Sequence, residues 1–418
     1  MKHHLRNLAV PVFAMGLLAM SGMNGCKSNT EDQRRPFIFT LATTFDNAVV
    51  RIPVIDEENS KVLYDIDCNG DGEYETKSIT GSIECVFPKK GKHQISMRGE
   101  IPHLSLGMIQ AYCEGESCAK ACEASCREDC EIVTQPFRIL DRAEDPFKVC
   151  DIKRWTANKD GYCQASCTKA PKDLDDKNRW RYGRHILSID QWGDNAWKSM
   201  RGFAASCEQI RIKAEDKPNL SQVEDMTGMF LRAYAMNDPV GDWDVSHVKT
   251  MNGVFSDCES FNQPLNSWDV SHVTEMYGMF EYCSSFNQPL DKWNVSNVEI
   301  MTALFRGANL FNQPLNSWDV SHVTVMGVMF DKAVNFNQPL ENWNVSNVMN
   351  MTAMFQGAKK FNQPLEKWNV SKVQLMGWMF NGTDRFNQPL DKWDVSNVTN
   401  MNYMFGRSKK FKEPLNNY

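Results

Sequence analysis

The sequence contains little histidine, no excess of positive charge and no long apolar run. Eight histidines are spread over 418 residues, and the formal net charge is −6. The sequence has no glycine-rich phosphate loop and no basic stripe of the kind that binds nucleic acid. Its repeated C-terminal half also has no unique grouping of Ser, His and Asp that could place a nucleophile beside its base. We therefore predict that the protein is not an enzyme and does not bind nucleic acid.

The first residues have the three parts of an export signal. The basic start "MKHHLR" precedes the short apolar run "NLAVPVFAMGLLAM" and small residues that end at Cys26. This order predicts a signal peptide over residues 1–25, since the apolar run is too short to span a bilayer comfortably. The residues "SGMNGC" resemble the lipobox of bacterial lipoproteins, in which the cysteine is diacylated and becomes the new N-terminus. The resemblance implies a lipid anchor at Cys26; the alternative is a secreted protein cut near Gly25.

The residues after Cys26 carry further information on location. The two residues that follow Cys26 are Lys27 and Ser28, and neither is aspartate. In a Gram-negative cell the lipoprotein resemblance therefore implies the outer membrane and not the inner one. Residues 26–35 are polar, and we interpret them as a tether. The chain has 14 cysteines, which suits an oxidising compartment outside the cytosol.

Residues 36–105 have the pattern of a small β-sandwich. Alternating or β-branched runs such as "FIFTLAT", "KVLYDID" and "HQISMRGEI" are separated by turns such as "NGDG" and "KKGK". Short strands at this spacing predict a small β-sandwich. The stretches "YDIDCNGDGEYE" and "FPKKGKHQIS" resemble the PKD family, which implies an immunoglobulin-like sandwich. Cys68 and Cys85 lie on candidate neighbouring strands, and we expect them to form a disulfide.

One turn of the predicted sandwich has two interpretations. Asp67, Asn69, Asp71 and Gly72 form D-x-N-x-D-G, the opening of a calcium loop, in which alternate oxygens converge on a hard cation. The twelfth position is Ser78 instead of glutamate, and no helix pattern follows. The other interpretation is therefore a polar hairpin turn without metal. Calcium aside, we predict no cofactor.

Residues 106–183 are rich in cysteine. The segment "CEGESCAKACEASCREDC" holds four cysteines spaced four apart, with alanine and glutamate between them, which favours a helix with these thiols on one face. We predict a helical insertion stitched by disulfides, because CxxC spacing and a nearby histidine for a metal cluster are missing. Their connectivity stays open. The cysteines are Cys113, Cys118, Cys122, Cys126, Cys130, Cys150, Cys163 and Cys167.

Residues 220–418 repeat nearly the same words every 25 residues. Tryptophan recurs from Trp243 to Trp393 and phenylalanine from Phe230 to Phe405, both at intervals of 25. A period this strict predicts a solenoid in which each repeat is one stacked turn. Residues 184–219 echo the repeat irregularly, as expected of an N-terminal cap.

Each repeat predicts a strand followed by a short helix. In "PLNSWDV" the pattern L-x-x-W-x-V matches the strand of leucine-rich repeats, with Leu265, Trp268 and Val270 pointing inward. In "VTEMYGMF" apolar residues at i, i+3, i+6 and i+7 indicate a short α- or 3₁₀-helix over residues 273–280. One repeat has too few apolar side chains for a core of its own, so we expect each Trp to stack on the next Trp and each Phe on the next Phe.

Two repeated slots could suggest chemistry. Cys258 and Cys283 share a slot that later repeats fill with alanine or threonine. We expect free buried thiols there, with a disulfide between the two as the alternative. The slot of His247, His272 and His322 holds asparagine or lysine in other repeats, so we interpret these histidines as solvated and not as a metal ladder.

The outward row of the predicted strands is the candidate binding face. Stacked strands would form a parallel sheet, whose outward residues make a polar, short-chained row suited to an extended partner. The alternative is that the row only keeps the sheet soluble. It comprises Ser267, Asp269, Lys292, Asn294, Ser317, Asp319, Asn342, Asn344, Lys367, Asn369, Lys392 and Asp394.

The repeats resemble the BspA-like leucine-rich-repeat surface proteins of bacteria. The words "FNQPL..WDVS.V..M..MF" and "LSIDQWGDNAW" carry the resemblance over residues 187–418. It implies an exported, lipid-anchored protein that attaches to proteins or glycans at a cell surface or in the extracellular matrix. The alternatives are a structural spacer that displays the Cys-rich module, a carbohydrate-binding protein, and an enzyme whose site lies in the Cys-rich insertion. The expected fold is mixed, with an all-β sandwich, a helical insertion and a solenoid.

Overall fold

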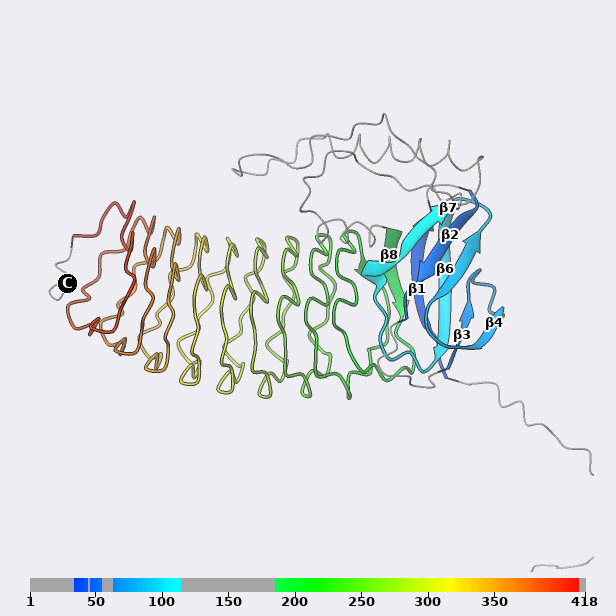
Figure 1. Cartoon of the computed structure of the whole chain (residues 1–418), viewed down its shortest axis with the longest axis horizontal. Helices are drawn as coiled ribbons and strands as arrows, with labels where there is room; N and C mark the ends of the chain where they lie inside the picture. The colour runs from blue at the N-terminus through cyan, green and yellow to red at the C-terminus, as the bar shows by residue number, and fades with distance from the viewer. Residues whose placement is uncertain (1–33, 44–45, 55–62, 114–184, 413–418) are drawn as a thin grey trace, which may run out of the picture. The chain divides into compact units, whose positions relative to one another are not determined.

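The computed structural model describes residues 34–43, 46–54, 63–113 and 185–412 (Figure 1). The predicted signal peptide, the predicted lipidation site Cys26 and the cysteines from Cys118 to Cys167 lie outside these residues. Within the described residues, a β-sandwich is followed by a solenoid of stacked turns.

The sandwich has two sheets. The larger has the strand order β4–β3–β6–β1–β8–β9 and the smaller the order β5–β2–β7. All pairings are antiparallel except that of β8 with β9, which is parallel. The strands are β1 (Phe37–Thr43), β2 (Ala48–Ile52), β3 (Tyr64–Asp67), β4 (Thr76–Ile79), β5 (Ile83–Phe87), β6 (Gly91–Gly99), β7 (Gln110–Cys113), β8 (Ile186–Gln191) and β9 (Arg211–Ile212).

The inner face of the sandwich follows from the alternation in the sequence. In β1, Phe37, Phe39 and Leu41 are buried while the residues between them are half-buried, because successive side chains of a strand point to opposite faces. Cys68, directly after β3, forms a disulfide with Cys85 in β5, with 5.6 Å between their Cα atoms. The predicted pairing is confirmed, but the bond joins the two sheets and not neighbouring strands of one sheet.

The sandwich covers the first turn of the solenoid. Strand β8 belongs to that turn and pairs with β1 of the larger sheet. The ring of Phe37 lies 5.2 Å from that of Trp197 and 6.0 Å from that of Phe203. Leu106, in the 3₁₀-helix η1 (Leu106–Met108), donates its N–H to the carbonyl of Phe203. The apolar end of the stack is therefore closed by another part of the chain, as solenoids require.

The solenoid contains stacked turns in place of the expected strands and helices. Each repeat contributes one isolated parallel bridge, and the bridges connect Asp225, Thr250, Glu275 and their counterparts up to Asn400. The segment Leu265–Val270 is not a strand, although Leu265, Trp268 and Val270 are buried as predicted. The leucine-rich-repeat assignment placed the ladder about six residues too early, since inward spacing alone does not locate the bridging residue.

The predicted helix over residues 273–280 is also wrong. Two consecutive turns, closed by hydrogen bonds from Met279 to Met276 and from Cys283 to Phe280, replace it. Gly278 and Tyr282 both have φ near 56°, the left-handed value that the third residue of a type II turn needs. Met276, Gly278 and Phe280 instead donate their N–H groups to the next repeat. Successive four-residue turns bury side chains at nearly the helical spacing, which explains the wrong prediction.

The fold class therefore needs correction. The described residues contain no α-helix, and their one helical element is the three-residue η1. The expected mixed fold is wrong for this part of the chain, and a helical Cys-rich insertion is not supported. The predicted boundary at residue 106 is also displaced, because η1 and β7 belong to the sandwich and Cys113 ends β7.

Aromatic columns form the core of the solenoid. Neighbouring Trp318 and Trp343 stack with ring centroids 6.5 Å apart, and Phe305 and Phe330 stack at 5.7 Å. The side chains of both columns are nearly or fully buried, except that of Phe405, which is half-buried. The predicted stacking is confirmed for the phenylalanines from Phe230 to Phe405 and for the tryptophans from Trp293 to Trp368.

Candidate binding surface

All twelve residues of the predicted binding face are exposed, but many of their polar groups are used within the solenoid. Asp269 accepts a hydrogen bond from the N–H of Ser271 at 3.0 Å, and the aspartate or asparagine of each later repeat does the same. Hydrogen bonds from Ser271 hold the pKa of Asp269 below its usual range. Lys367 and Lys392 pair with Glu341 and Glu366, at 3.4 Å each. This row therefore resembles a set of turn-forming groups more than a free ligand surface.

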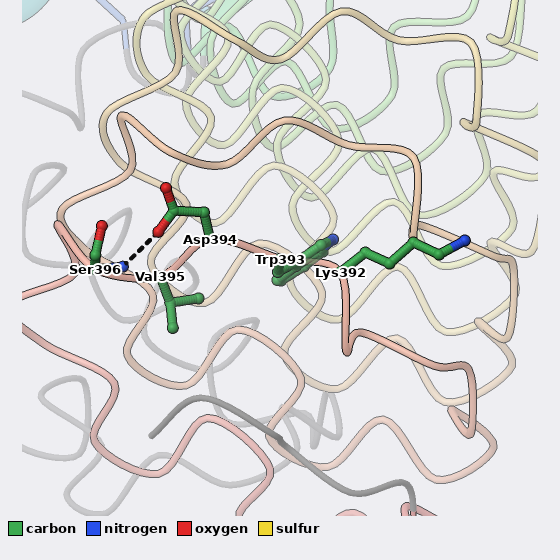
Figure 2. A pocket seen from close by; sticks show the side chains of 5 residues that line it. All are labelled: Lys392, Trp393, Asp394, Val395 and Ser396. Carbon is green, nitrogen blue, oxygen red and sulfur yellow. Dashed lines mark hydrogen bonds between the residues drawn. The ribbon is translucent and has the colours of Figure 1, made fainter.

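A pocket of about 350 Å³ lies at the end of this row. Figure 2 shows its lining, Lys392 to Ser396, with the hydrogen bond from Ser396 to Asp394. Val395 is half-buried here, whereas the equivalent Val370 is covered by the next turn and is 1% exposed. The pocket thus lies at the last described position of the row, because no further described turn covers it.

The other repeated polar residues also hold the stack together. The side-chain carbonyl of Asn312 accepts the backbone N–H of Asn337 at 2.9 Å, and the same ladder runs from Asn237 to Lys412. The indole N–H of Trp318 donates to the carbonyl of Leu290 at 3.0 Å, and this bond too recurs in each repeat from Trp268. The first Asn of "FNQPL" and the Trp of "WDVS" are therefore explained by stacking.

The buried thiols and the histidines have equally structural positions. Cys258 and Cys283 are free, and their thiols donate to the carbonyls of Phe230 and Phe255 at 3.0 and 2.9 Å. Thr383 fills the same slot and makes the same bond. Burial raises the pKa of both thiols, so they stay protonated and poorly nucleophilic. The alternative disulfide between them does not form, and His247, His272 and His322 are exposed, as predicted.

Three carboxylates converge at the turn that was considered for calcium. Oxygen atoms of Asp67, Asp71 and Glu75 all lie within 4.8 Å of one another. Asp67 also accepts hydrogen bonds from the N–H groups of Asn69, Gly70 and Gly72, so protein hydrogen bonds hold the turn. Sequence reasoning missed Glu75 because it tested only the twelfth position of the loop. Calcium binding stays a prediction, and the cluster is compatible with both earlier interpretations.

The turn face differs between the two ends of the solenoid. We define the turn face as the outward side chains of the segment equivalent to residues 277–285 in each repeat. Over the segments 227–235, 252–260, 277–285, 302–310 and 327–335 it carries three basic and four acidic residues. Over 352–360, 377–385 and 402–410 it carries six basic residues and one acidic residue. The charge thus changes from about balanced to net +5 along the row.

Fold and surface together define a repeat protein of the stacked-turn solenoid class. The chain belongs to the family described as "Mycoplasma protein of unknown function, DUF285", whose model matches residues 198–318 and 301–418. No curated protein and no solved structure matches the chain. In the part of the chain that the structure describes, we find no helix of the length and apolarity needed to traverse a bilayer.

Proposed function

We propose that the protein is a non-catalytic, lipid-anchored surface protein whose solenoid binds partners on other cells or in the extracellular matrix. The supporting observation is how the solenoid uses its residues. Apart from the exposed proline, most residues identical among the repeats are buried or bonded to the adjacent turn, as with Trp318 and Asn337. Positions that differ among repeats, such as Tyr277, Leu310 and Trp378, point outward. Stability therefore accounts for the repeated residues, and the varied exposed residues are left to determine what the protein binds.

A rod of stacked turns suits contact with an extended partner. Adjacent turns lie about 5 Å apart, close to the strand spacing of a parallel sheet. Equivalent side chains of successive repeats therefore form rows along the rod, and a long partner can touch several of them at once. Many modest contacts then add up to useful affinity without any deep pocket.

The anchor is tested by replacing the proposed acylated cysteine. In a bacterial host that processes lipoproteins, the natural protein should partition with detergent-extracted membranes. The Cys26→Ser variant should be released in soluble form, because it lacks the thiol that carries the lipid. If both partition alike, the lipobox interpretation fails.

Binding is tested on intact cells. Cells that display the full chain should attach to surfaces coated with matrix proteins or matrix glycans more than cells without it. An excess of soluble Cys26→Ser protein should compete and reduce this attachment. Attachment equal to that of the control cells on every surface would contradict the proposal.

A further inference from the structure

We propose that the turn face of residues 352–360, 377–385 and 402–410 binds an acidic polysaccharide. This inference rests on the proposed binding function and specifies its partner. The site lies in the last repeats of the solenoid, drawn in orange to red in Figure 1. It combines two exposed aromatic rings with a group of cations.

The aromatic part consists of Trp378 and Tyr403, which occupy the same position in adjacent repeats. Their ring centroids are 5.6 Å apart with 21° between the ring planes. Trp378 is 38% exposed and Tyr403 is 68% exposed, whereas the tryptophan and phenylalanine columns of the core are buried. An exposed stack of two rings offers an apolar platform on which the C–H face of a pyranose ring can pack.

The backbone conformation of Trp378 and Tyr403 indicates that these two residues do not serve to stabilise the fold. Trp378 and Tyr403 have φ near 57° and 58°, in the left-handed region that disfavours bulky residues. Earlier repeats fill this slot with small residues, such as Gly253, Gly278 and Ala303. A large aromatic residue held in a costly conformation and left in contact with water points to a binding role.

The cationic part lies in the same turn segments as the rings, seven residues further along each segment. Lys360, Arg385 and Lys410 occupy one slot in three successive repeats and are all exposed. Lys359 and Arg407 are exposed on the same turn face. Among the described residues none of these five side chains forms an ion pair, while Lys409 pairs with Asp384 at 3.4 Å. The row thus offers unneutralised charge at each successive step of the stack.

Two of the three basic side chains on the turn face of the earlier repeats are neutralised within the protein; the third is Lys332. Arg306 pairs with Glu281 at 3.0 Å and with Asp331 at 3.1 Å, and Arg232 pairs with Asp257 at 3.5 Å. The contrast indicates that the last repeats present their cations to a ligand. A polymer with carboxylate or sulfate groups complements this charge.

An extended acidic polysaccharide fits this surface better than a nucleic acid. The turns recur at about 5 Å, close to the length of one sugar residue in an extended chain, so successive sugars meet successive basic residues. The short-chained amide of Asn402 is exposed beside Tyr403 and can bond sugar hydroxyls. The chain as a whole is acidic, at −6, which opposes the long-range attraction that polyphosphate binding relies on.

The test measures binding of soluble Cys26→Ser protein to four polymers: heparin, polygalacturonate, the neutral glycan dextran and single-stranded oligothymidylate. We expect heparin or polygalacturonate to bind more tightly than the other two, and increasing salt to weaken the binding. Lys360→Glu/Arg385→Glu/Lys410→Glu should reduce the affinity by about tenfold or more, because three contacts are lost together. Trp378→Ala should also weaken it, and quenching of tryptophan fluorescence by the bound polymer should decrease in that variant.

The matched control is Lys292→Glu/Lys367→Glu/Lys392→Glu. It makes the same change in net charge, but on the row of residues first predicted as the binding face. It should bind as the parent does, and circular dichroism should show both triple variants folded. Equal loss in both variants, no binding of either acidic glycan, or tighter binding of the oligonucleotide would each overturn the inference. If the displayed protein still mediates attachment in those cases, the proposed function survives without this ligand; if attachment is also absent, both fail.

Discussion

The sandwich and the solenoid reach order in opposite ways. In the sandwich, long antiparallel ladders such as β1 with β6 set the register, and side chains alternate between core and solvent. In the solenoid, each repeat has a single bridging residue per neighbour, together with backbone hydrogen bonds to the next turn and rows of identical side chains. Among the described residues, the sandwich therefore joins unlike segments by strand pairing and the Cys68–Cys85 disulfide, whereas the solenoid joins equivalent segments of successive repeats.

This difference determines which substitutions matter in each region. A core residue of the sandwich touches different partners on each side, so its neighbours can adapt singly. A core residue of the solenoid contacts copies of itself, and a vacancy interrupts a whole column. Four predictions examine this contrast, in order of decreasing effect.

The largest effect is expected from a break in the tryptophan column. Trp318→Ala removes a ring that stacks on Trp293 and Trp343 and a bond to Leu290. We expect a loss of about 3–5 kcal/mol in the free energy of unfolding, measured by urea denaturation. Trp318→Phe keeps an aromatic ring and leaves one carbonyl without its donor, so it should cost about 1–3 kcal/mol. Equal losses would show that stacking contributes little.

Removal of the disulfide should act on the sandwich and leave most of the solenoid unchanged. The bond joins Cys68 to Cys85, 17 residues apart, and closing a loop of this length stabilises a fold by about 3 kcal/mol. Hydrogen exchange should show faster opening of β3 and β5 in Cys68→Ala/Cys85→Ala. Protection in residues 250–400 should not change. Equal loss of protection there would mean that the two regions unfold as one unit.

A smaller effect of opposite sign is expected from the turn residue Val328. It has φ near 53°, which a β-branched side chain adopts only with strain. Val328→Gly should therefore raise the free energy of unfolding by about 0.5–1 kcal/mol, seen as a higher melting temperature. The matched control is Val323→Gly, at a buried site without positive φ, which should destabilise. A lower melting temperature for Val328→Gly would contradict the strain argument.

The smallest effect concerns acid stability. Hydrogen bonds from the following serine hold the pKa of Asp269 and Asp319 below the usual 3.8. A lowered folded-state pKa contributes stability that is present above the unfolded pKa and is lost as the pH falls through the folded pKa. Asp269→Asn/Asp319→Asn keeps the acceptors, as Asn294 and Asn344 do, but does not titrate. The drop in melting temperature between about pH 7 and pH 3 should therefore be smaller than in the parent; an equal drop would refute this origin.

Burial in the repeats could be predicted from the sequence, but the secondary structure could not. Leu265, Trp268 and Val270 are buried as expected, because a strict period forces equivalent residues onto the same column. Nothing in their spacing separates a strand from an extended turn. The regular glycines at 228, 253 and 278, which have positive φ, were the available signal for turns in place of a helix.

The candidate surface was only partly visible in the sequence for a related reason. The prediction chose Asp269 and its counterparts because aspartate or asparagine recurs at that position in each repeat. The residue recurs there because its side chain forms the turn. Trp378 and Tyr403 depart from the pattern, and a comparison of the repeats slot by slot would have singled them out. Their exposure and stacking needed the structure, because the core also consists of stacked aromatic rings.

The self-matching of adjacent turns has a consequence for the length of the molecule. Each turn offers its successor the same hydrogen-bonding and apolar surface that it receives from its predecessor, as the asparagine ladder shows. Whole units of 25 residues can therefore be inserted or removed by recombination between similar stretches of the gene without designing a new core. The length of the solenoid and the number of its exposed repeat surfaces can thus change by whole repeats during evolution. An insertion or deletion of any other length would put the columns out of register.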